Sequence, residues 1–230
     1  REAEAGLPLV VSKEPGGTSL GRELRTLLLA PHASGESWCP KAELLLFYAD
    51  RAQHLATVVR PALAEGKVVL VDRFEDSSWA YQGAQGVAEA DLARLREVVL
   101  GAFRPDLTLV LDMDPEASLE RVDARNARLG ASFNETRFDQ EALEFHRKVR
   151  QRFREMAGRE PGRFLVVPAQ DGPDAVAAAI WDRVSAFLEG RAPDAEAARE
   201  AARLAASEIA PISDVRGSAE YRRALLGRLV

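Results

Sequence analysis

A charged pair, Asp72 and Arg73, directly follows the apolar run Val68 to Val71 and opens the segment DRFEDSSWAYQG. Ligands of open parallel sheets bind beyond the carboxyl ends of the strands, so the pair stands where a site is expected. Three side chains behind it can donate or accept hydrogen bonds with a ligand: Ser78, Tyr81 and Gln82. A surface ion pair is the alternative interpretation, because neighbouring acids and bases are common.

A second candidate lies in LLLFYADRAQH, residues 44–54, where Phe47 and Arg51 are four residues apart. On a helix this spacing places both side chains on one face. An aromatic ring beside a guanidinium can hold a flat heterocycle, by stacking and by hydrogen bonds to a carbonyl group. An amphipathic helix also accounts for the pair, with Phe47 in the core and Arg51 at the solvated edge.

The third candidate, KEPGGTSLG, begins at Lys13 and follows a short apolar run. Pro15 restricts the chain, Gly16 and Gly17 allow the backbone to approach a ligand, and the Lys13 ammonium could meet a phosphate. A simple turn is the alternative. The segment matches neither the dinucleotide-binding fingerprint nor GxxxxGK[ST].

An arginine-rich segment could close over phosphate groups and neutralise their charge. Its candidate side chains are Arg121, Arg125, Arg128 and Arg137. The alternative is a solvated helix face, in which acidic neighbours such as Glu120 and Asp123 balance the arginines.

Composition narrows the classes of function. The 230 residues carry a formal net charge of -5 with no basic cluster of the kind that grips a nucleic-acid backbone, so no nucleic-acid partner is expected. HExxH does not occur, and the three histidines are scattered along the chain, which disfavours metal hydrolysis. A lone Cys39 and the lack of an apolar run of about 20 residues predict a cytoplasmic protein that does not enter a membrane.

Short apolar runs alternate with helical patterns, which indicates an α/β fold with a parallel sheet covered by helices on both faces. The predicted strands are Leu9 to Ser12, Val68 to Asp72, Leu107 to Asp112 and Phe164 to Pro168. The predicted helices are 18–29, 41–64 with a kink or restart at Pro61, 89–101, 115–129, 138–157 and 173–189. We expect one domain over 1–189, a linker at 190–194 and a helical C-terminal tail over 195–230.

In this order, the segments resemble bacterial thymidylate kinase over about residues 5–188. KEPGGTSLGRELRTLLL is similar to the family's REPGGT segment and its helix, and LLLFYADRAQH resembles the helix that lines the thymine pocket. DRFEDSSWAYQG resembles the family's DR-x-x-x-S-S-x-A-Y-Q-G segment. The resemblance implies a P-loop-kinase-like fold that uses ATP with Mg²⁺ to phosphorylate dTMP to dTDP, in a protein expected to be a homodimer.

The resemblance also implies a role for each matching residue. Phe47 would stack on thymine, and Arg51 would hydrogen-bond an exocyclic oxygen of the base. Arg73 would hold the monophosphate, with Asp72 near the magnesium and phosphates. The remaining assignments are Pro15 in the pocket wall, Ser78, Tyr81 and Gln82 on the nucleoside, and Arg121, Arg125 and Arg137 as lid arginines on the phosphates of ATP. Asp72, Arg73 and Arg125 would be the catalytic set.

Two departures from the family qualify this expectation. The family begins with a strand and a GxxxxGK[ST] loop, and both are absent from this sequence, so we expect little activity if nothing precedes Arg1. A catalytically inactive dTMP-binding module or a truncated or fused fragment is therefore the alternative. The tail from about 192 to 230 resembles the C-terminal end of the FAD-binding medium subunit of xanthine and carbon monoxide dehydrogenases, a helical piece for which no FAD is expected.

Overall fold

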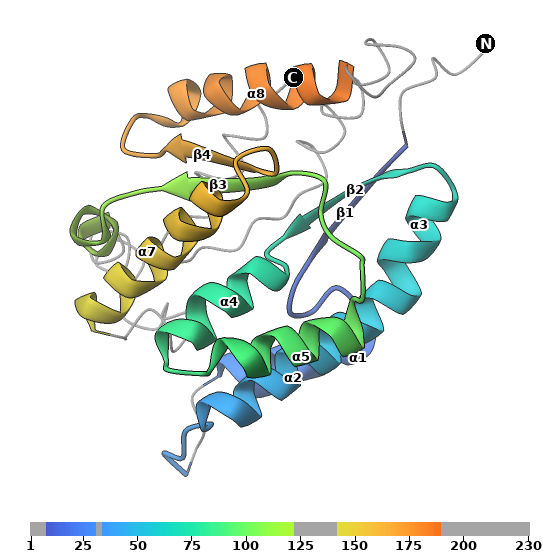
Figure 1. Ribbon diagram of the computed structural model, residues 1–230, viewed down its shortest axis with the longest axis vertical. Helices are drawn as coiled ribbons and strands as arrows, with labels where there is room; N and C mark the ends of the chain where they lie inside the picture. The colour runs from blue at the N-terminus through green and yellow to red at the C-terminus, as the bar shows by residue number, and fades with distance from the viewer. Residues whose placement is uncertain (1–7, 31–33, 122–141, 190–230) are drawn as a thin grey trace.

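The computed structural model of the chain describes residues 8–30, 34–121 and 142–189. Strands and helices alternate along these residues (Figure 1). The strands are β1 (Leu9–Lys13), β2 (Val68–Asp72), β3 (Thr108–Asp112) and β4 (Phe164–Pro168). The helices are α1 (Ser19–Leu29), α2 (Pro40–His54), the π-helical η1 (Leu55–Val59), α3 (Arg60–Ala64), α4 (Glu75–Ala84), α5 (Glu89–Val99), α7 (Leu143–Arg159) and α8 (Pro173–Glu189), with a further helical segment at 115–121.

The strands form two parallel pairs, β1 with β2 and β3 with β4. Within the described ranges, no backbone ladder joins β2 to β3. In the first pair, Lys13 is in register with Asp72, so the two strands end side by side. In the second pair, Asp112 is in register with Pro168. Each pair therefore offers one edge of aligned carboxyl ends, which is the edge where ligands of such sheets bind.

Helices cover both faces of the β3–β4 pair, as the sequence predicts (Figure 1). Val110 and Phe164 pack with α7 residues in one apolar cluster. Leu109 and Leu111, which point to the opposite face, pack with Val167 and α8 residues in another cluster. This alternation follows from the two-residue period of a strand and explains the continuous apolar run in the sequence.

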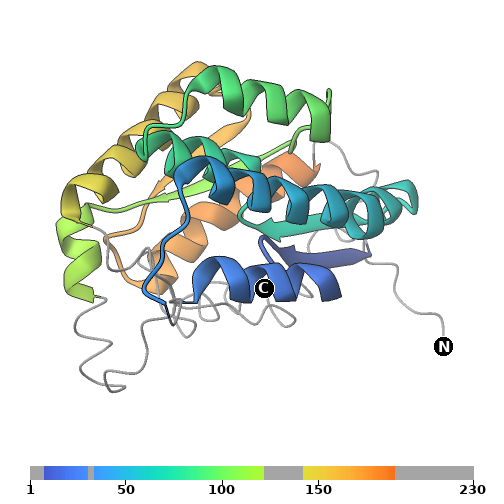
Figure 2. The same ribbon diagram turned by 90° about the horizontal axis from the view of Figure 1, so that it is seen from below.

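The predicted helix at 41–64 is interrupted where the sequence suggests. Pro61 lies in the first turn of α3, where its missing N–H removes no helical hydrogen bond. The five π-helical residues of η1 precede it and connect α3 to α2. Seen from below in Figure 2, α2, η1 and α3 follow one another as a nearly continuous rod.

All four predicted strands are present in the structure. Two strands have the predicted bounds, β1 extends by one residue to Lys13, and β3 begins at Thr108 instead of Leu107. Helix α4 was absent from the predicted helices. The linker at 190–194, the tail, and residues 122–141 of the arginine-rich segment lie outside the described residues.

None of the helices among residues 8–30, 34–121 and 142–189 has the length and apolar character that crossing a membrane requires.

Candidate functional site

The carboxyl ends of β1 and β2 bring the two predicted turns together. The backbone N–H of Glu14 donates to the carbonyl of Asp72 at 3.0 Å, one step beyond the ladder of the paired strands. The KEPGG turn therefore lies beside the Asp72–Arg73 turn, with α2 packed along the same region. The first and third candidate segments of the sequence form one site.

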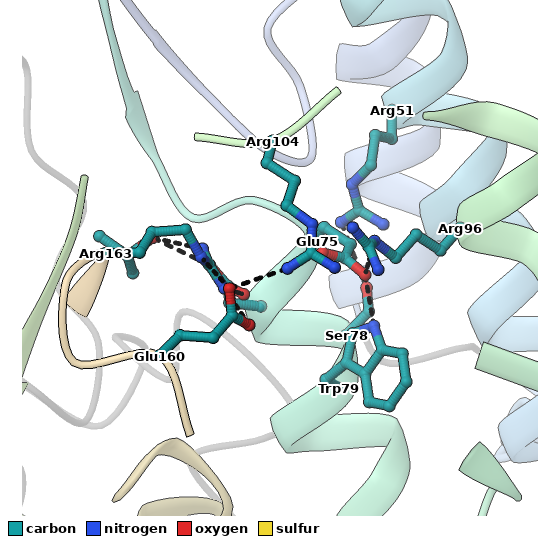
Figure 3. Close-up of polar contacts among 10 residues, drawn as sticks. Arg51, Glu75, Ser78, Trp79, Arg96, Arg104, Glu160 and Arg163 are labelled. Atoms are coloured by element: carbon teal, nitrogen blue, oxygen red, sulfur yellow. Dashed lines mark hydrogen bonds and ion pairs between the residues drawn. The ribbon is translucent and has the colours of Figure 1, made fainter. Parts of the chain in front are cut away.

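Arg51 on α2 lies at the centre of this site and is almost completely buried, with 1% of its surface exposed. Its Nε donates to Glu14 at 2.8 Å, and its Nη2 donates to the Ser78 hydroxyl at 3.2 Å. Arg51 and Ser78 are among the residues labelled in Figure 3. The guanidinium also lies 4.6 Å from the ring centre of Tyr48 and 5.5 Å from that of Phe74. Nη1 is buried and has no hydrogen-bond partner among the described residues. The alternative of a solvated Arg51 is wrong.

Asp50, the neighbour of Arg51, holds the glycine turn. Its Oδ1 accepts a hydrogen bond from the backbone N–H of Gly16 at 3.1 Å. Burial raises the pKa of Asp50, against the opposing effect of that hydrogen bond. A Cβ on Gly21 would lie 2.3 Å from the same oxygen, so the beginning of α1 approaches α2 closely. Asp50 on α2 and the beginning of α1 thus hold the KEPGG backbone in place.

Arg73 adopts an unusual backbone conformation, with φ at 67°, in the left-handed region that residues other than glycine rarely occupy. Such conformations gather at functional sites, where the surrounding structure maintains them. The Arg73 guanidinium lies 5.0 Å from the ring centre of Tyr81. Tyr81 packs in the same apolar cluster as Phe47, so the predicted phosphate-binding and base-stacking side chains meet there.

Gln82 and Ser78 are both buried on α4 and face α2. The Gln82 amide nitrogen donates to Oε1 of Glu43, which is also buried. Because Glu43 on α2 accepts from the amide nitrogen of Gln82, the amide oxygen of Gln82 faces away from Glu43.

The cationic edge of the site carries Lys13 and Arg25. Burial lowers the pKa of Lys13, and the nearby Arg25 lowers it further. Arg25 donates from Nη1 to the Pro15 carbonyl at 3.0 Å and packs against Gly16. Pro15 is preceded by a cis peptide bond.

The ends of β3 and β4 form a separate polar region. Arg150 on α7 binds Asp112 through Nε and Nη2, at 2.7 and 3.0 Å, and reaches Asp114 through Nη1 at 3.2 Å. A surface hollow of about 590 Å³ lies beside this cluster. Arg121 donates to the carbonyls of Ala169 and Gln170 in the loop after β4. Arg121 therefore lies at the end of β4, apart from the cluster around Arg51.

Most of the predicted site residues are brought together by the structure. The group at the ends of β1 and β2 comprises Pro15, Phe47, Arg51, Asp72, Arg73, Ser78, Tyr81 and Gln82. Arg125 and Arg137 lie outside the described residues. Within the described ranges, no group of three or more His, Cys, Asp and Glu side chains is arranged to hold a metal ion.

Four residues at the site were not proposed from the sequence as parts of it. Glu14, Glu43 and His54 are buried partners of the predicted residues, and Arg25 contacts the turn. A signal was available for His54, because it lies one helical turn after Arg51 and shares its face. Glu14 sits within the KEPGG segment, yet nothing local in the sequence indicates that its carboxylate is buried.

The sequence matches the Thymidylate kinase family over residues 2–180, which is more than half of the chain. The chain belongs to the thymidylate kinase family. Thymidylate kinase of Solidesulfovibrio magneticus is 46% identical over 185 residues, 80% of this chain and 88% of the relative. Thymidylate kinase of Synechococcus sp. is 44% identical over 201 residues, 87% of this chain and 89% of the relative.

A solved structure supports the same fold. The crystal structure of thymidylate kinase from Ehrlichia chaffeensis superposes with a TM-score of 0.58 at 27% identity, and covers 78% of this chain and 80% of that one. The thymidylate kinase resemblance and the P-loop-kinase-like fold class are confirmed, and the chain is a member of a phosphotransferase family.

The C-terminal resemblance is confirmed as well. Residues 173–230 match the CO dehydrogenase flavoprotein C-terminal domain. This match begins earlier than the sequence analysis placed it and includes α8, whose Val176 and Ile180 pack on Val167 of β4. The two family matches overlap by the first turns of this helix.

Proposed function

We propose that this protein binds dTMP at the carboxyl ends of β1 and β2 and transfers the γ-phosphate of ATP to it, giving dTDP and ADP. One observation carries the proposal. The buried Arg51 keeps a hydrogen-bond donor, Nη1, without a partner among the described residues, at the position where the family resemblance assigns recognition of the base. A buried, unpaired donor of a charged group is costly, and a ligand carbonyl group would satisfy it.

The roles of the other residues follow the same proposal. Phe47 stacks on the thymine ring, with Tyr81 and Ser78 on the nucleoside, and the Gln82 carbonyl faces the base because Glu43 takes its amide nitrogen. Arg73 binds the monophosphate from its left-handed turn. The protein's contribution to rate in this type of reaction is positioning and charge neutralisation.

The phosphate donor enters as ATP with its Mg²⁺, which is part of the substrate. We propose that Asp72 lies near the magnesium and the phosphates, and that Arg121, Arg125 and Arg137 act on the donor phosphates. Arg121 donates to loop carbonyls here, so it would exchange those neutral acceptors for phosphate oxygens. A phosphate oxygen is the stronger acceptor because it is charged.

A turnover assay tests the proposal. The protein is incubated with ATP, Mg²⁺ and dTMP, and dTDP and ADP are measured by ion-exchange chromatography. Arg73→Ala is expected to reduce turnover by at least about a hundredfold, by loss of a charged contact to the phosphate. The matched control is Arg104→Ala, since Arg104 binds the exposed Glu160 outside the site. Absence of dTDP with the unsubstituted chain contradicts the proposed reaction.

Binding of dTMP without turnover is the second candidate. It would apply to a chain without a donor loop such as GxxxxGK[ST], because that loop cradles donor phosphates in P-loop kinases. Calorimetric titration with dTMP separates the two candidates. Saturable dTMP binding together with background turnover supports the second, whereas binding with turnover supports the first.

A homodimer in the cytoplasm belongs to the same proposal. Leu20 and Leu27 on α1 and Leu45 on α2 are 57%, 41% and 56% exposed, and the two helices are in contact. Leu20 and Leu27 are two helical turns apart and share one face. An apolar surface of this kind suits association with a second copy. Leu45→Glu is expected to shift the sedimentation coefficient to that of a monomer, and an unchanged value contradicts this interface.

A further inference from the structure

A continuous chain of buried hydrogen bonds runs behind Arg51. Ser12 Oγ lies 2.7 Å from His54 Nε2, and His54 Nδ1 lies 2.9 Å from Oε1 of Glu14. The second carboxylate oxygen of Glu14, Oε2, accepts from Arg51 Nε at 2.8 Å. Glu14 and His54 are 3% and 0% exposed, so water does not compete for these bonds.

The donors and acceptors of this chain fit together in one direction. Arg51 can only donate, and a carboxylate can only accept. In the arrangement that satisfies every partner, His54 Nδ1–H donates to the carboxylate, and its Nε2 pairs with the Ser12 hydroxyl. Each oxygen of Glu14 is therefore assigned to one donor, which fixes the carboxylate and, through it, the plane of the Arg51 guanidinium.

The order of serine, histidine and acid also resembles that of a nucleophilic triad, but the packing excludes that chemistry. A Cβ placed on Gly17 would lie 2.6 Å from Ser12 Oγ and 2.7 Å from His54 Nε2. The glycine backbone therefore covers the hydroxyl, and no substrate carbon can approach it. Glu14 is, in addition, shared with Arg51, which a triad acid is not. The hydrogen-bonded series of Ser12, His54 and Glu14 therefore supports Arg51 and performs no bond-making step.

The remaining contacts of Arg51 leave one direction open. Tyr48 and Phe74 lie against its guanidinium, and Ser78 accepts from Nη2, so Nη1 is the nitrogen that has no partner among the described residues. A fixed donor requires an acceptor on the ligand. In thymine the ring atom opposite the sugar is position 4, and it carries an exocyclic oxygen that can accept such a bond.

We infer that Glu14 is a positioning residue for base recognition, which holds Arg51 so that Nη1 meets the 4-oxygen of the pyrimidine, and that His54 and Ser12 hold Glu14. This inference rests on the proposed dTMP site and adds the residues that set its preference for a carbonyl group at position 4. Glu14 contacts no ligand atom in this account and acts only through Arg51.

The test compares two ligands and a conservative variant. Dissociation constants are measured by calorimetry for dTMP and for its analogue that lacks the 4-oxygen. The unsubstituted chain is expected to prefer dTMP by about tenfold, the value of one hydrogen bond to a charged group. In Glu14→Gln, the preference is expected to fall below about twofold, because a neutral amide oxygen holds the guanidinium more weakly than a carboxylate does. The side-chain shape is nearly kept, since glutamine only replaces one carboxylate oxygen with an amide nitrogen.

A matched control separates positioning from a general loss of stability. Asp76→Asn makes the same type of change in another buried carboxylate, which accepts from Arg163 at 2.8 and 2.9 Å. Arg163 is labelled at the left of Figure 3. It is expected to lower the melting temperature while it leaves the preference for the 4-oxygen at its original value. A preference lost equally in this control and in Glu14→Gln overturns the inference.

Ser12→Ala is the second variant, because it removes the far end of the chain and leaves no charge unpaired. It is expected to narrow the preference by about twofold, in line with one neutral hydrogen bond. If Glu14→Gln and Ser12→Ala both keep the parent's preference for dTMP over the analogue, the inference is overturned. The proposed function is not affected by that outcome. No binding of dTMP to the unsubstituted chain overturns the proposed dTMP site, and the inference with it.

Discussion

Arg51 and Arg150 occupy corresponding places in the two strand pairs. They differ in how many of their guanidinium nitrogens are paired with protein carboxylates. Each lies on a helix beside the carboxyl ends of its pair and binds an acid there. Arg150 has all three nitrogens on Asp112 and Asp114, and its side chain is 26% exposed. Arg51 is buried, shares one acid, and retains Nη1.

The number of guanidinium nitrogens without a protein partner distinguishes an arginine that can bind a ligand from one that links parts of the fold. All three guanidinium nitrogens of Arg150 are paired with protein carboxylates, so Arg150 links α7 to β3. An arginine with a buried, unused donor is unfavourable for the folded chain alone, and function is the usual reason that such a group is kept. The unpartnered Nη1 therefore supports our proposal of a base-recognition site at the first pair, whereas Arg150 in the second pair makes structural ion pairs.

The largest expected effect comes from removing each arginine. Arg51→Ala is expected to lower the free energy of unfolding by about 3–5 kcal/mol, because Glu14 is left as a buried, half-paired charge. Arg150→Ala is expected to cost about 1 kcal/mol, because water can reach Asp112 and Asp114. Urea denaturation of both variants measures the difference. Equal losses contradict the distinction drawn between the two regions.

A smaller effect is expected from adding one methyl group in each region. Gly17→Ala is expected to lower the free energy of unfolding by about 1–3 kcal/mol, because its Cβ would collide with Ser12 and His54, which are held by their own hydrogen bonds. The matched change is Gly158→Ala in α7, where a Cβ meets nothing within 4 Å. It is expected to raise the free energy of unfolding by up to about 1 kcal/mol, since alanine favours the helix. Thermal unfolding measures both variants. A Gly17→Ala variant that is as stable as the parent would contradict the close packing at this turn.

The architecture was largely predictable from the sequence. Continuous apolar runs identified the strands, and the position of Asp72 and Arg73 at a strand end indicated a candidate site. Helix α4 was missed because Ser77, Ser78 and Gly83 are weak helix formers, and its packing against α7 overrides their propensity.

The interior of the site was less predictable. Helical periodicity allows Arg51 at a solvated edge, and the sequence does not encode that Glu14 reaches it across 37 positions of chain. A buried ion pair depends on two elements meeting in space, which a local pattern does not report. The specific roles of Phe47 and Gln82 came from the resemblance to a family and stay predictions, as does the division into domain, linker and tail.

The smallest predicted effect is a difference in pH dependence between the two regions. Burial raises the pKa of Asp50 above its ordinary value of 3.8, so the folded chain holds this proton more tightly than the unfolded chain. Its contribution to stability is therefore lost as pH rises from about 3.8 through the raised pKa. In the second region, hydrogen bonds from Arg163 lower the pKa of Glu160 below 4.5, so its contribution is present above 4.5 and lost as pH falls.

Asp50→Asn and Glu160→Gln should therefore change the slope of stability against pH in opposite directions. The stability of Asp50→Asn relative to the parent should increase as pH rises through the Asp50 window, whereas that of Glu160→Gln should decrease over the acidic range. Urea denaturation at several pH values between 3 and 7, on the order of half a unit apart, resolves both slopes, since each reflects the uptake of less than one proton. If the stability of both variants relative to the parent changed with pH in the same direction, burial would not be the dominant influence on the pKa of Asp50. The proposed contrast between the buried Asp50 and the more exposed Glu160 would then be wrong.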